Sequence, residues 1–378
     1  MVPNYPPLIQ VADNQGYVKK ERDSNLELFR IVTMLLIIAH HYVVNSNVMG
    51  MIKENPAVDA SMFLTVFGAW GKTGINCFML ITGYFMCKAS ISLHKFLKLV
   101  TQILFYNLVI YAVFIMAGIE EFGVKALINK FLLVKNMNDG FTSGFIMFYL
   151  FIPFLTILVK NLTQRQHLIL VGLILLTFTV GGSMPSFTGI SVSVNYVIHF
   201  SNLFVIASYV RFYGFPVGIS HRQWGWATLV SLGLGAASVL VMLWRFSRMG
   251  SDAPFGAFYW VADSNKIFAM TTAFCAFMWF KELKIGYSKT INLLGGATFG
   301  VLLIHANSNA MRQWLWNEVV DCAGHFSDPW LWLYAPACVL SIFIICALIE
   351  LVRSSFLEEP VVRWSSRAVK AVTRALPG

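Results

Sequence analysis

The chain has 378 residues, of which 57% are hydrophobic and only 12% are charged. An ordinary soluble domain carries roughly a quarter charged residues, so this composition excludes a typical water-soluble globular protein. The net charge of +10 is not accompanied by a basic-aromatic binding module, so nucleic acid is not an expected partner.

Apolar runs long enough to cross a bilayer, which takes roughly 20 residues of helix, recur from Leu26 almost to the end of the chain. The runs are continuous and do not alternate in polarity, which favours helices over barrel strands. We therefore predict an all-α, polytopic membrane protein of about ten transmembrane helices. Their expected ranges are 26–47, 67–87, 97–118, 143–160, 166–182, 194–212, 224–245, 259–280, 291–308 and 330–352.

Three regions are expected along the chain. Residues 1–25 form a polar N-terminal arm that lacks the apolar core of a signal peptide, so the first helix serves as its own insertion signal. Residues 26–352 form one membrane domain without an internal repeat. Residues 353–378 form a tail that is either a basic amphipathic helix on the anionic cytoplasmic leaflet or a simple solvated segment. Its basic side chains are Arg363, Arg367, Lys370 and Arg374.

The distribution of Lys and Arg predicts the orientation of the helices in the membrane. If the N-terminus is cytoplasmic, the cytoplasmic segments carry twice as many of these residues as the outer segments, as the positive-inside rule requires. An even number of spans then returns the C-terminus to the cytoplasm. Both termini are therefore predicted to be cytoplasmic.

The first predicted span contains four ionisable residues, which inside a membrane helix indicate function by default. Arg30 and His41 are eleven residues apart and share one face, separated by roughly 16 Å along the helix axis. Glu27 precedes Arg30 by three residues and can pair with it. His40 points about 100° away from His41, so we expect it to pack elsewhere. The alternative is an Arg that reaches the cytoplasmic interface and a His bonded to a neighbouring helix.

The six cysteines show no metal-ligand spacing and no disulfide framework. We expect most of them to be buried free thiols. No metal site is predicted.

Three motifs carry a resemblance to a known family. Glu27-Leu-Phe-Arg30, followed by ten residues and His41, resembles the first-helix motif of the acyltransferase-3 family, the bacterial integral membrane O-acyltransferases. The segment 74–85 is similar to that family's second-helix motif, with Asn76 where Asp is frequent. The segment 298–305, which ends in His305, resembles its late motif. The order of the motifs and the predicted number of spans agree with the family over nearly the whole chain.

The resemblance implies an enzyme in the bacterial cytoplasmic membrane that transfers an acyl group from cytoplasmic acetyl-CoA or another acyl-CoA to a hydroxyl. The acceptor would be an extracytoplasmic or lipid-linked carbohydrate. Acyl-CoA is then a co-substrate, and no bound cofactor is expected. On this hypothesis His41 is the general base, and Arg30, oriented by Glu27, holds the donor or steadies its charge.

Further positions are predicted to bind the two substrates. Lys88, Lys95 and Lys98 stand where the family has an arginine pair and are candidates for the donor phosphates, or they reflect only the positive-inside excess. His305, Asn309 and Arg312 follow at spacings of four and three, which gives a polar stripe toward the outer end for the acceptor or for structural hydrogen bonds. Other acceptor candidates are Asn76, Tyr149, Asn195, Tyr196 and Asp263.

Two other functions remain open. Intramembrane His, Arg and Glu also occur in proton-coupled transporters and flippases, although this chain shows no repeat of inverted halves. An acyltransferase-like sensor or assembly partner without chemistry is the third possibility.

Overall fold

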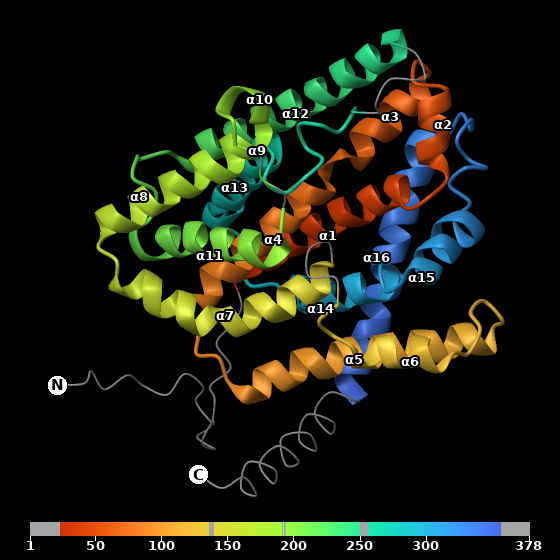
Figure 1. Cartoon of the computed structure of the whole chain (residues 1–378), viewed down its shortest axis with the longest axis horizontal. Coiled ribbons are helices and arrows are strands. Elements are labelled where there is room, and N and C mark those ends of the chain that lie inside the picture. The colour runs from red at the N-terminus through yellow and green to blue at the C-terminus, as the bar shows by residue number, and fades with distance from the viewer. Residues whose placement is uncertain (1–22, 136–139, 191, 193, 250–255, 357–378) are drawn as a thin grey trace, which may run out of the picture.

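The protein is described by a computed structural model that covers residues 23–135, 140–190, 192, 194–249 and 256–356. These residues are mostly helical and contain no β-strand, so the predicted all-α fold class is confirmed. Figure 1 shows the arrangement of the helices. In chain order they are α1 (Ser24–Val44), α2 (Val48–Glu54), α3 (Asp59–Phe67), η1 (Gly68–Trp70), α4 (Gly71–Met86), α5 (Leu93–Met116), α6 (Val124–Phe131), α7 (Phe141–Asn161), α8 (Gln164–Ile174), η2 (Leu175–Val180), α9 (Gly181–Ser183), α10 (Pro185–Thr188), α11 (Tyr196–Tyr213), α12 (His221–Met249), α13 (Ile267–Glu282), α14 (Lys289–His305), α15 (Asn309–Gln313), η3 (Trp314–Val319) and α16 (Leu331–Phe356).

Seven helical segments among the described residues are long and apolar enough to cross a membrane. An eighth is possible if α14 and the α15–η3 segment, which bend by 97° at their break, form one span. The chain is therefore a multi-pass membrane protein. The seven segments are Ser24–Val44, Asp59–Met86, Leu93–Met116, Phe141–Asn161, Gln164–Ser183, His221–Met249 and Leu331–Phe356.

Each of the ten predicted spans contains a helix, but three of these helices belong to none of the seven segments. α13 has 16 residues and α14 has 17, below the roughly 20 that a bilayer requires. α11 has 18 residues and carries the polar His199 and Arg211. The total of ten spans thus stays a prediction. The amphipathic tail predicted within 353–378 lies outside the described residues beyond Phe356, as does most of the arm 1–25.

α1 is the helix against which several others pack. It contacts α4, α13, α14 and α16 and lies near the middle of the molecule in Figure 1. α4 runs antiparallel to it, because Gly71 lies against His40 and Gly74 against Ile37. A Cβ at either glycine would overlap these α1 side chains, so the glycines allow the two backbones to approach closely.

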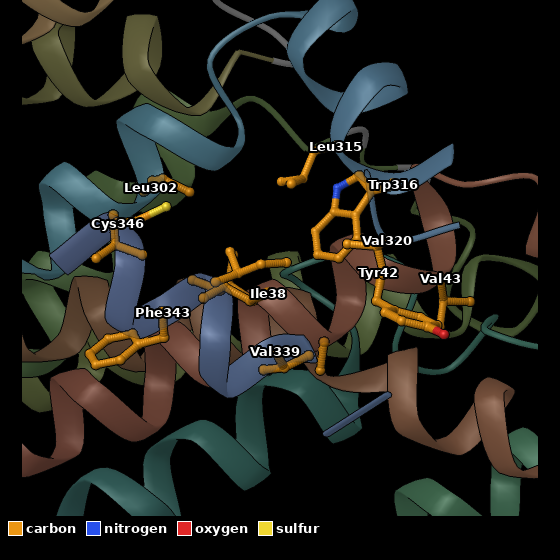
Figure 2. Close-up of a cluster of buried hydrophobic side chains, with 14 of the residues drawn as sticks. Ile38, Tyr42, Val43, Leu302, Leu315, Trp316, Val320, Val339, Phe343 and Cys346 are labelled. Atoms are coloured by element: carbon orange, nitrogen blue, oxygen red, sulfur yellow. The ribbon is translucent and has the colours of Figure 1, made fainter. Parts of the chain in front are cut away.

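One hydrophobic core joins α1, α16 and the η3 segment. Figure 2 shows α1 residues such as Ile38 and Tyr42 among side chains of α16, including Phe343, with Trp316 of η3 beside Tyr42. The rings of Tyr42 and Trp316 meet edge to face with centroids 5.8 Å apart, a geometry that aromatic pairs prefer. This packing fixes the C-terminal half of α1.

A buried ion pair within α16 is hydrogen-bonded to α5. Arg353 donates to both carboxylate oxygens of Glu350, each at 2.8 Å. From α5, Gln102 Nε2 donates to the same carboxylate at 2.9 Å and Tyr106 OH donates at 2.6 Å. Such bidentate and additional hydrogen bonds are needed to offset the cost of burying both charges.

Gly300 of α14 lies against this ion pair, and a methyl group there would overlap Cγ and Cδ of Glu350. The carboxylate cannot move aside freely, because Arg353 and Tyr106 hold it. We expect Gly300→Ala to lower the free energy of unfolding by about 1–3 kcal/mol and to reduce the thermal midpoint followed by tryptophan fluorescence in detergent.

Gly172→Ala in α8 is the matched control, because a Cβ there meets no atom within 4 Å. It should keep or raise the midpoint, since Ala favours helix over Gly. An equal midpoint for both variants would show that the α14–α16 contact tolerates a methyl group.

Candidate active site

A polar cavity of about 580 Å³ lies at one end of the helix bundle. The end of α1 borders it, together with the first residues of α4, α7 and α11 and the last turn of α14. Its lining includes histidine, cationic, amide and phenol side chains, among them His40, His41, Lys72, Asn107, Tyr196 and Arg312.

His41 reaches this cavity from the last turn of α1. Neither Gly nor Pro interrupts α1 between Ser24 and Val44, so the helix continues unbroken to the cavity. His40 lines the cavity as well, with its ring centroid 5.9 Å from that of His41 and its Nδ1 2.6 Å from the Gly68 carbonyl. As expected, His40 packs against a neighbouring helix, with its ring on Gly71 at the start of α4, and this packing also places it at the border of the cavity.

α14 ends at His305, where the chain breaks and bends. Asn307, Ser308 and Asn309 follow, and such residues favour helix caps over helix interiors. The Ser308 hydroxyl accepts from the Met311 backbone N–H at 3.1 Å and begins α15. The break leaves His305 at a helix end, fully buried behind His41.

The two histidines form a directed hydrogen-bond chain. His305 Nδ1 lies 2.6 Å from the Val301 carbonyl oxygen, which only accepts, so this nitrogen donates. In a neutral imidazole the other nitrogen, His305 Nε2, then accepts from His41 Nδ1 across 3.0 Å. His41 Nε2 therefore keeps its lone pair. A histidine fixed in this tautomer is oriented to take a proton.

Amide, phenol and ammonium groups form another part of the polar wall. Lys72 Nζ donates to the Tyr196 hydroxyl at 2.9 Å, which joins α4 to α11. Asn307 Nδ2 donates to Asn107 Oδ1 at 3.2 Å, which joins the α14 break to α5. Two buried amide atoms, Asn45 Nδ2 and Asn307 Oδ1, have no hydrogen-bond partner within the described residues.

Glu27 and Arg30 lie toward the opposite end of α1. Glu27 Oε1 is 3.9 Å from Arg30 Nη1, so the predicted pair forms. The Arg30 guanidinium also lies 6.0 Å from the centroid of the Phe78 ring in α4. Neither residue lines the cavity, and eleven residues of helix rise separate Arg30 from His41 by roughly 16 Å.

The comparison with protein families identifies the chain. The model of the acyltransferase-3 family, described as an acyltransferase domain, matches residues 23–350. The chain belongs to the acyltransferase-3 family. No curated protein and no solved structure matches it. The resemblance drawn from the motifs around His41 and His305 is thus confirmed, and the protein is a membrane acyltransferase.

The three lysines predicted to bind the donor of this acyltransferase lie at the Arg30 end. Because α4 runs antiparallel to α1, its end lies near the start of α1, and Lys88 follows that end. Lys95 and Lys98 lie in the first two turns of α5. All three are exposed, and Lys95 Nζ donates to the Ser90 carbonyl at 2.9 Å.

Four predicted acceptor residues lie outside the cavity lining. His305 is one of them, because it is fully buried. Asn76 is fully buried, where its amide donates to the Ser264 carbonyl at 2.7 Å and accepts from His199 at 2.8 Å. Tyr149 is buried against Phe96. Asn309 is exposed and accepts from Arg312. Two further candidates also lie outside the lining. Asn195 caps the start of α11, and Asp263 is exposed before the start of α13.

Sequence reasoning missed the cavity residues Lys72, Asn45, Asn107 and Asn307. Lys72 lies within the predicted span 67–87, two residues before the family-like segment 74–85, and was not singled out. The Asn307-Ser308-Asn309 run signals a break next to His305, which could have drawn attention to Asn307. Within the described residues no group of three or more His, Cys, Asp or Glu could hold a metal ion.

We expect His305→Leu to lower acyl transfer about 100-fold, because the His41 ring loses its partner and its defined tautomer. His305→Gln should retain part of the activity, since a side-chain amide oxygen can accept from His41 Nδ1. Initial rates of acyl transfer by both variants, with folding checked by size-exclusion chromatography, measure the difference. Equal activity of His305→Leu and the unmodified protein would exclude a positioning role for His305.

Proposed function

We propose that this acyltransferase moves an acyl group from cytoplasmic acyl-CoA to a hydroxyl of an extracytoplasmic or lipid-linked carbohydrate, with His41 as general base. The observation that carries the proposal is the chain from the Val301 carbonyl through His305 to His41, which leaves His41 Nε2 as an acceptor beside a polar cavity. The proposed acyl donor is acetyl-CoA.

The proposed reaction needs one proton acceptor and no covalent enzyme intermediate. The acceptor oxygen attacks the thioester carbonyl while His41 Nε2 takes the hydroxyl proton. The carbon–sulfur bond then breaks, an ester forms, and CoA leaves as the thiol after receiving the proton from the imidazolium. His305 accepts a hydrogen bond from His41 Nδ1 during the whole reaction. This bond orients the His41 ring and stabilises the imidazolium.

Polar atoms around the cavity support a hydroxyl-rich acceptor. Asn45 Nδ2 can donate and Asn307 Oδ1 can accept, and both are buried without a partner in the described part of the chain. Unpaired buried amide atoms are costly, and sugar hydroxyls, which both donate and accept, would satisfy them. Tyr196 and Lys72 add a phenol and an ammonium on the facing wall.

The donor would enter from the Arg30 end of the bundle. We assign this end to the cytoplasm from the excess of Lys and Arg, with ten spans and both termini cytoplasmic in a bacterial cytoplasmic membrane. Arg30, held by Glu27, would contact the donor within the bundle, while Lys88, Lys95 and Lys98 would contact its phosphates at the mouth. The extended pantetheine arm would place the thioester near His41.

One observation also fits a transporter. Bent, interrupted helices occur at the substrate sites of secondary transporters, and α14 bends by 97° where it meets α15. The family match favours the acyltransferase. A transport role would leave no acylated product.

Replacing His41 tests the proposed base most directly. His41→Gln keeps a donor for His305 but removes the basic nitrogen, so acyl transfer should fall about 10²–10⁴-fold. His167→Gln is the matched control, because His167 is also buried in the helix bundle but bonds the Val205 carbonyl away from the cavity. Transfer of radiolabelled acetyl from acetyl-CoA to envelope glycans in membranes provides the measurement. Retained activity in correctly inserted His41→Gln protein would refute the base assignment.

Removing two of the proposed phosphate contacts should affect binding of the donor alone. The double variant Lys95→Gln/Lys98→Gln should raise KM for acyl-CoA about threefold to tenfold and leave kcat unchanged. Lys284→Gln, an exposed lysine after α13, is the control. If KM does not change, these lysines contribute only to the charge difference between the two sides of the membrane.

A further inference from the structure

Arg312 is a cation in the cavity wall that the proposed chemistry does not use. It lies in α15, just beyond the break that ends α14 at His305. It lines the same cavity as His41, and it is only partly exposed. Burying part of a guanidinium costs free energy, and an anion bound in the cavity would offset that cost.

The protein partners of Arg312 are neutral. Its Nε donates to the Ser308 carbonyl at 3.3 Å, and its Nη2 donates to the Asn309 side-chain oxygen. A guanidinium carries five N–H donors, so these two bonds orient the group without exhausting it. No Asp or Glu is among the described residues that line the cavity. The guanidinium charge is thus held in place by neutral oxygens.

The position of Arg312 separates it from the proposed donor path. Arg312 lies at the end of the bundle where α1 ends, whereas Arg30 and the lysines near the start of α5 lie at the other end. A phosphate group of CoA held at the Arg30 end would not reach Arg312 in the same pose. The group that meets Arg312 would therefore belong to the second substrate.

We propose that the acceptor carries a negatively charged group, a carboxylate or a phosphate, that Arg312 binds while the reacting hydroxyl lies at His41. This inference rests on the proposed function, because it names the class of that acceptor. Arginine suits both groups, since its planar N–H pairs match the two oxygens of either anion. Lys72, on the α4 side of the cavity, gives the same region further positive charge.

The test is equilibrium binding of matched saccharides to the purified full-length protein in detergent at constant ionic strength. One pair is a tetramer of galacturonate and its carboxyl-reduced neutral counterpart. The second pair is glucose 6-phosphate and glucose, and CoA is measured separately. We expect at least one anionic member to bind about tenfold or more tightly than its neutral counterpart, and its identity distinguishes a carboxylate from a phosphate.

Variants link this preference to one side chain. Arg312→Gln should abolish the preference, and Arg312→Lys, which keeps the charge but not the paired donors, should retain part of it. Arg222→Gln, an exposed arginine of α12, is the control and should leave it unchanged. CoA binding should be the same in all four proteins.

Several results would overturn the inference. These are equal binding within both pairs, no binding of either anionic member, or a charge preference that survives Arg312→Gln. Weaker CoA binding in Arg312→Gln would assign this arginine to the donor and would overturn it as well. Acyl transfer is assayed separately, so an anion preference without transfer would reject the proposed reaction and leave the anion site intact.

Discussion

The hydrogen bond between His41 and His305 is the interaction on which the candidate site depends. It spans 3.0 Å between α1 and α14, and a second bond from His305 to the Val301 carbonyl fixes its direction. Inside a membrane domain, an imidazole without a partner would be costly and free to choose either tautomer. The hydrogen-bond chain resolves both problems, because it pairs His41 Nδ1 and leaves the lone pair of Nε2 free on a residue that lines the cavity. General base catalysis needs such an acceptor, and this is why His41 is the base in the acyl transfer proposed for this acyltransferase.

This bond requires that α14 end at a defined depth and that α1 and α14 stay in register. The cap formed by Ser308 sets the end of α14, because its hydroxyl begins the next helix. The register depends on packing further down the bundle, where Gly300 brings α14 against α16 at the Glu350–Arg353 pair. A buried ion pair is weak evidence for stability, but its fixed geometry limits the ways in which two helices can pack. The core around Tyr42 and Trp316 holds the other side of α1.

The two ends of α1 differ in chemistry. Its N-terminal end carries the Glu27–Arg30 pair and lies near exposed lysines, whereas its C-terminal end borders a cavity with histidines, amides and Arg312. The proposed reaction, in which a cytoplasmic donor and an acceptor approach from opposite sides, would use such a division. The roughly 16 Å between Arg30 and His41 is a distance that an extended thioester arm, and not a compact ligand, would cover.

The sequence by itself determined the all-helical membrane class, the family and the Glu27–Arg30 pair, and it singled out His41 and His305 as candidates, because hydropathy, helical spacing and short motifs are local properties of the chain. The contact between the two histidines, the place of His40 and the cavity wall of Lys72, Asn107 and Asn307 were decided only by the tertiary structure. Asn76 shows the same limit, since its motif position suggested a ligand, whereas its amide joins α4 to His199. The physical reason is that a polar residue on a helix has the same local pattern whether it faces a cavity or a neighbouring helix. Which of the two it faces depends on how closely helices distant in the sequence approach, and buried glycines such as Gly71 and Gly300 set that approach in the folded bundle.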